Sequence, residues 1–149
     1  MSTSNVETPA ALAPKAANRI RMASFGALTM LVTQFVLGTA YSLYGTAPTN
    51  GKPVGMFSSP LLAVHVILGI LLIIAAIMLV VRAIQARRTP LVATTVAGLL
   101  VIAGAFGAGS SFARDGSNGA SLGMALLTAV AMLCYAANLV IVGKPDAST

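Results

Sequence analysis

The sequence contains little charge. Only 8% of its 149 residues are charged, whereas a typical soluble domain carries about 25%. So few charges cannot solvate the surface of a soluble globule. With 57% of residues apolar, a disordered chain is excluded as well, because disorder requires low hydrophobicity. The composition therefore predicts an integral membrane protein.

Histidine, cysteine and acidic residues are also scarce. The chain has one histidine, one cysteine and three acidic residues. A lone Cys134, expected to be a small buried hydrophobe, excludes the CxxC pair of a thiol oxidoreductase. No carboxylate lies in an apolar segment, which excludes an Mg²⁺-dependent phosphotransferase and a proton-coupled small multidrug exporter. Because one histidine cannot supply a hydrolase triad or a metal site, we expect no metal and no enzyme activity, except redox chemistry through haem.

Four apolar segments are long enough to cross a bilayer as helices. They cover about residues 22–42, 60–81, 90–112 and 119–142. Short connections force neighbouring helices to run antiparallel. The expected fold is therefore all-α: an integral membrane, up-down-up-down four-helix bundle over residues 19–143. Residues 1–18 are expected to form a disordered cytoplasmic tail and residues 144–149 a second cytoplasmic tail.

The first apolar segment allows a second interpretation. Cations precede it and the small residues Gly38, Thr39 and Ala40 follow its apolar run, an order that also occurs in cleavable signal peptides. The run is longer than the usual 7–15 apolar residues of such peptides. The length favours a retained span, and the sequence alone leaves cleavage open.

The positive charges orient the expected bundle. Two cations, Lys52 and Arg114, fall on one side of it, whereas the other side holds Lys15, Arg19, Arg21, Arg82, Arg87, Arg88 and Lys144. Cytoplasmic loops carry the excess of Lys and Arg. We therefore expect a multi-pass protein of the cell membrane with both termini cytoplasmic. Nucleic acid is not expected as a partner, because no basic stripe is interleaved with aromatic residues.

Polar residues within the segments gather toward the expected outer leaflet. His65 is the one ionisable side chain inside a span, and such a residue is by default a candidate site. Small and polar residues also form packing stripes at intervals of three or four residues. The expected stripes are Ala27, Gln34, Gly38 and Tyr41 in the first segment, His65, Gly69, Leu72 and Ala76 in the second, and Ala97, Gly104, Ala108 and Ser111 in the third. The candidate pocket residues in the outer half are Gln34, His65, Ser110, Ser111 and Ser121.

Two short runs carry a resemblance to known proteins. Residues 62–69 (LAVHVILG) and 34–38 (QFVLG) resemble elements of small, uncharacterised four-span bacterial membrane proteins. These families are loosely similar to cytochrome b561-type haem bundles. The resemblance implies a bacterial inner-membrane bundle that holds a b-type haem between two histidines on facing helices.

The second histidine of such a bundle is missing here. The start of the fourth segment, residues 119–124, reads GASLGM. Methionine can replace histidine as an axial haem ligand, and Met124 lies at a depth that matches His65. A haem could thus be bound by His65 and Met124, or shared by two copies of His65 in a homodimer.

Three functions follow as expectations. The first is a structural or accessory subunit that packs in the lipid bilayer against a larger membrane complex or a second copy of itself, without a cofactor. The second is a haem-binding electron-transfer protein that uses His65. The third is a bundle that binds a small molecule or lipid in a pocket in its outer half.

Overall fold

The protein is a bundle of four helices. The computed structural model describes residues 14–45, 48 and 52–143, and every regular element in this part of the chain is α-helical. The helices are α1 (Pro14–Tyr44), α2 (Pro60–Gln85), α3 (Thr89–Asp115) and α4 (Asn118–Gly143). All four are long and apolar enough to cross a membrane. The predicted all-α class and its four apolar helices are confirmed.

The first helix is longer than expected. Residues 14–18 belong to α1, so the expectation of a disordered tail up to residue 18 is wrong for these residues. Proline suits the first position of a helix, and the Lys15, Ala16 and Ala17 that follow Pro14 are strong helix formers. The remaining residues of the two expected tails, 1–13 and 144–149, lie outside the described residues.

Short connections end the other helices. The Ser59 side chain caps α2 by accepting a hydrogen bond of 3.2 Å from the Leu62 amide. Arg87, with φ 52°, reverses the chain between α2 and α3. Gly116 adopts φ 64° at the end of α3, a left-handed conformation that glycine tolerates. Because α3 continues to Asp115, only residues 116 and 117 connect α3 to α4, fewer than the residues 113–118 expected from the sequence.

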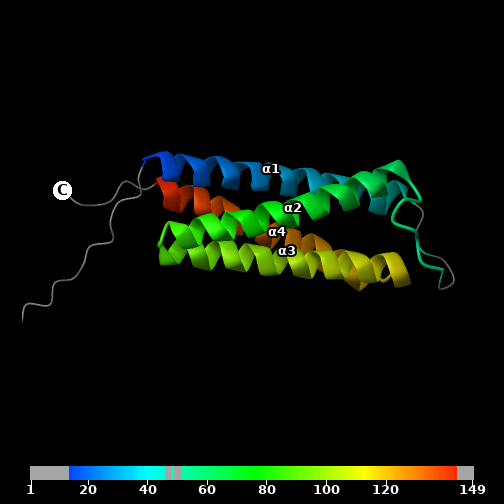
Figure 1. The fold of residues 1–149 in the computed structure, drawn as a ribbon. Helices are drawn as coiled ribbons and strands as arrows, with labels where there is room; N and C mark the ends of the chain where they lie inside the picture. Colours follow the sequence, from blue (N-terminus) through cyan, green and yellow to red (C-terminus); the bar gives the residue numbers. More distant parts are fainter. Residues whose placement is uncertain (1–13, 46–47, 49–51, 144–149) are drawn as a thin grey trace, which may run out of the picture.

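Each helix contacts two others. The packed pairs are α1–α2, α2–α3, α3–α4 and α1–α4, so the helices surround a common centre (Figure 1). The start of α1 and the end of α4 lie at one end of the bundle, here named the terminal end. Residues 45–59 connect α1 to α2 at the opposite end, here named the loop end.

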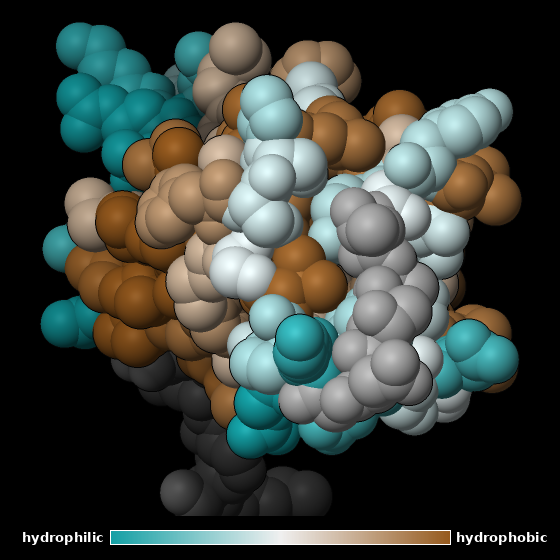
Figure 2. All heavy atoms as spheres, turned by 90° about the vertical axis from the view of Figure 1, so that its right-hand side faces the viewer, coloured by the Kyte–Doolittle hydropathy of each residue, from teal (hydrophilic) through white to brown (hydrophobic). Residues whose placement is uncertain are grey.

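The best-packed part of the interior lies toward the terminal end. Tyr135, Leu79 and Leu91 are almost completely buried there. The outer faces are strongly apolar: Leu133 is 70% exposed and Leu100 67% exposed. Seen from the loop end, hydrophobic side chains cover the flanks of the bundle and polar side chains gather on the end face (Figure 2). Soluble monomers rarely expose such extensive apolar surface.

Candidate ligand-binding site

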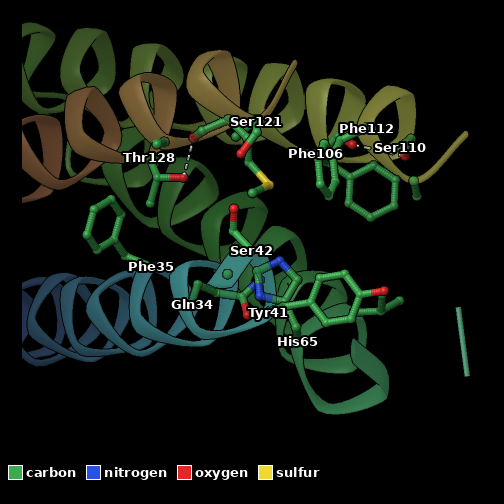
Figure 3. A pocket seen from close by; sticks show the side chains of 18 of the residues that line it. Gln34, Phe35, Tyr41, Ser42, His65, Phe106, Ser110, Phe112, Ser121 and Thr128 are labelled. Atoms are coloured by element: carbon green, nitrogen blue, oxygen red, sulfur yellow. Dashed lines mark hydrogen bonds between the residues drawn. The ribbon is translucent and has the colours of Figure 1, made fainter. Parts of the chain in front are cut away.

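A cavity of about 470 Å³ opens in the half of the bundle near the loop end. All four helices and residues of the α1–α2 connection line it, and side chains from α1 and α2 face those from α3 and α4 across it (Figure 3). Its walls are mostly apolar. Its polar lining residues are Gln34, Thr39, Tyr41, Ser42, His65, Ser110, Asn118, Ser121 and Thr128. Pockets of this size and character accept small organic ligands.

A glycine on α1 makes room for the histidine of α2. A Cβ built on Gly38 would lie 3.2 Å from Cε1 of His65, closer than ordinary van der Waals contact. The close approach of α1 and α2 at Gly38 therefore positions the His65 ring at the cavity.

A second glycine contact positions Gln34. A Cβ built on Gly69 of α2 would lie only 2.9 Å from Nε2 of Gln34, so the amide packs directly over the α2 backbone. Oε1 of Gln34 and Nδ1 of His65 are both buried without a hydrogen-bond partner. A buried polar atom without a partner costs about 1–3 kcal/mol. On the wall formed by α1 and α2, Gln34 and His65 thus each have one buried polar atom that could bond a ligand.

Met124 crosses the bundle on the opposite wall. A Cβ built on Gly109 of α3 would lie 3.1 Å from its Sδ, and one built on Gly38 of α1 would lie 3.6 Å from its Cε. The thioether of this α4 residue therefore reaches from α3 to α1. His65 and Met124 approach the same glycine from different helices, which brings together the two residues expected to lie at one depth.

The structure brings four of the five expected pocket residues to one cavity. Gln34, His65, Ser110 and Ser121 line it. Ser111 does not; its Oγ instead accepts a long hydrogen bond of 3.4 Å from the Arg114 guanidinium. Consecutive helical residues point about 100° apart, since a turn has 3.6 residues, so Ser110 and Ser111 cannot share one direction.

The expected packing stripe of α3 is not the most buried face of this helix, although Gly104 and Ala108 do lie against Leu127 and Gly123 of α4. Ala97 and Gly104 are exposed, and the buried residues of this helix are Leu91, Thr95, Gly98 and Ile102. Small residues occur on every side of α3. Their spacing therefore did not show which face turns inward.

The cavity also has walls that sequence reasoning missed. Phe106 and Phe112 of α3 reach into it (Figure 3), and Met56 of the connection contributes to its rim. Large apolar residues occur throughout this chain, so their identity carries no signal. Only the gathering of polar residues near one end of the segments indicated this half of the bundle.

A separate polar layer lies near the terminal end. The Thr94 hydroxyl donates a hydrogen bond to Oδ1 of Asn138 and so links α3 to α4. One turn further along, a Cβ built on Gly98 would lie 3.1 Å from the Tyr135 ring. Tyr135 and Asn138 are both fully buried in this layer. This layer lies in the interior of the bundle, between the cavity and the terminal end.

The cavity contains two residues of the kinds that bind haem iron. His65 and Met124 are suitable axial ligands in kind, and both contact the Gly38 position. Met124 now spans from α3 to α1, so its side chain would have to withdraw before a porphyrin entered between them. Among the described residues, no three His, Cys, Asp or Glu side chains come together as a metal site.

Comparison with family models, with curated proteins and with solved structures finds no match.

Proposed function

We propose that the chain is a multi-pass protein of a bacterial inner membrane, an up-down-up-down bundle with both termini in the cytoplasm. Cytoplasmic ends carry the excess of Lys and Arg. The described cations at the terminal end are Lys15, Arg19, Arg21, Arg82, Arg87 and Arg88, against Lys52 and Arg114 at the loop end. This asymmetry supports a cytoplasmic terminal end and an outward-facing cavity.

In this arrangement the bundle binds a small amphipathic molecule in its loop-end cavity. The observation that carries this proposal is the combination of mostly apolar walls with two unpartnered polar atoms, on Gln34 and His65. A bound hydrogen-bonding group would remove the cost of leaving those atoms unsatisfied. The cavity contains His65 as its one general base, so we expect binding rather than catalysis.

The test is to fill the cavity. Ala105 of α3 lines it, whereas Ala103, two residues away on the same helix, is exposed. We expect Ala105→Phe to remove a small molecule that copurifies with the protein, as detected by mass spectrometry of solvent extracts. Ala103→Phe should retain it. If both variants and the unmodified protein release the same compounds in the same amounts, the pocket does not bind a ligand.

A second candidate is haem binding, favoured by the convergence of His65 and Met124 on Gly38. Haem would supply one-electron chemistry, with His65 and Met124 as axial ligands. An absorption spectrum of the purified protein tests it, as isolated and after dithionite. A Soret band that is lost in His65→Ala would establish haem in place of another small molecule. A spectrum without that band after haem is supplied would eliminate this candidate.

The role of an accessory subunit or homo-oligomer stays a prediction. The exposed apolar faces, which include Leu100 and Leu133, suit lipid as well as a partner protein. We therefore place ligand binding ahead of it. Copurification of a stoichiometric membrane partner under mild detergent would support the accessory role.

A further inference from the structure

The cavity lacks charge. Its lining includes no Lys, Arg, Asp or Glu among the described residues, and the chain between them, residues 46–47 and 49–51, contains none by sequence. The three charged residues near the loop end, Lys52, Arg114 and Asp115, are exposed and do not line the cavity. A ligand would thus find hydrogen-bonding groups but no counterion.

The polar and apolar parts of the cavity lie at different depths. His65, Ser110 and Ser121 are three to five residues from the loop ends of their helices, about 5–8 Å at 1.5 Å per residue. Leu31, Leu72 and Ile102 form the floor. They lie twelve or thirteen residues from those ends, about 18–20 Å deep. Between the mouth and the floor, two polar side chains interrupt the apolar wall: Gln34 and Thr128, each ten residues from the loop end of its helix. The Thr128 hydroxyl already donates a hydrogen bond to the Met124 carbonyl.

We infer that the ligand is an electrically neutral amphiphile with a hydrogen-bonding head group at His65 and Gln34 and an apolar part that reaches toward Leu31, Leu72 and Ile102. This inference rests on the proposed binding function and specifies its ligand class. An ionised carboxylate, phosphate or ammonium loses its hydration on entry and finds no opposite charge to replace it. A hydroxyl or amide group loses far less and can pair with the unpartnered atoms of Gln34 and His65.

Photocrosslinking with two matched probes tests the inference. A monoacylglycerol and an N-acyltaurine would carry the same diazirine-containing acyl chain; the first is neutral and the second is permanently anionic. The full chain is reconstituted in phosphatidylcholine vesicles, and labelled peptides are identified by mass spectrometry. Labelling that is lost in Ala105→Phe and kept in Ala103→Phe defines the signal from the cavity.

We expect cavity labelling by the neutral probe to exceed that by the anionic probe at least tenfold after correction for vesicle partitioning. Gln34→Leu should reduce the neutral signal about tenfold. Thr33→Leu should leave it unchanged, because Thr33 is exposed and its hydroxyl bonds the Thr29 carbonyl on the same helix. Retention of the full neutral signal in Gln34→Leu would refute the assigned head-group position.

The remaining outcomes separate the two proposals. Equal or stronger cavity labelling by the N-acyltaurine would overturn the neutral-ligand inference and leave the binding function standing. Cavity labelling by neither probe, together with identical solvent extracts from the Ala105→Phe and Ala103→Phe variants, would overturn the binding function itself.

Discussion

At the scale of single residues, glycines decide where polar side chains can lie. Gly38 and Gly69 let α1 and α2 approach closely enough for His65 and Gln34 to pack against the facing backbone. Small residues provide such close approach between membrane helices. The candidate site therefore depends on the absence of a Cβ at Gly38 and Gly69 as well as on the polar side chains of His65 and Gln34.

Gly38→Ala should disturb His65 specifically. The added methyl group would lie 3.2 Å from Cε1 of His65, whereas one added at Gly26 of the same helix meets nothing within 4 Å. Because the chain has one histidine, selective labelling yields a single imidazole Hε1–Cε1 resonance. We expect Gly38→Ala to shift it and Gly26→Ala to leave it in place. An unmoved resonance in both variants would refute the contact.

Gly98→Ala should lower the free energy of unfolding. The new methyl group would lie 3.1 Å from the ring of Tyr135, which is fully buried, and overpacking of this kind costs about 1–3 kcal/mol. The control is Gly107→Ala on the same helix, where nothing lies within 4 Å. This change should stabilise by up to about 1 kcal/mol through helix propensity. Unfolding of both variants in detergent measures the difference, and equal stabilities would contradict the packing.

At the scale of helices, termination is local and follows known rules. Ser59 caps α2, and Gly116 ends α3 in the left-handed conformation. Pro60 and Pro90 stand near the starts of α2 and α3, positions that proline favours. These signals explain why four helices and their approximate limits could be predicted.

Ser59→Ala should remove the cap of α2. The lost bond from the Leu62 amide to the Ser59 hydroxyl should cost about 1 kcal/mol of stability. Ser58→Ala is the matched control, because Ser58 is exposed and its main chain, not its side chain, bonds the Gly55 carbonyl. Thermal unfolding of the two variants in the same detergent distinguishes them. A Tm reduction shared by both would show that the cap contributes nothing.

The face that each helix turns toward the interior was harder to predict than the limits of the helices. On α1 and α2, the expected stripes contain the buried residues Ala27, Gly38, Gly69 and Ala76. On α3 the expected stripe includes the exposed Ala97 and Gly104, because small residues lie on all sides of this helix. Because the outer faces of the bundle are as apolar as its interior, hydrophobicity alone does not indicate which side of a helix turns inward.

At the scale of the whole molecule, the bundle has two unlike halves. The terminal half is filled by Tyr135 and its apolar neighbours, and the loop half contains the cavity. Cations gather at the terminal end. The charge asymmetry therefore predicts that the cavity opens toward the outer leaflet.

Cysteine accessibility tests this orientation. In a Cys134→Ala background, Ser58→Cys and Asn18→Cys place single thiols at exposed positions on the loop end and the terminal end, respectively. We expect a membrane-impermeant maleimide to label residue 58 in intact cells and residue 18 only after permeabilisation. The reverse pattern would invert the topology.

The sequence by itself determined the all-helical class and the four long apolar helices, because composition, segment length and helix-end signals are local properties of the chain. It also indicated which half of the bundle holds the candidate site, since Gln34, His65, Ser110 and Ser121 all lie in the halves of their helices near the loop end. Only the tertiary structure decided which polar side chains share a cavity. Helix rotation excludes Ser111 from it, and close glycine contacts place His65, Gln34 and Met124 around it. Such contacts join residues far apart in sequence, and their distances depend on how whole helices pack.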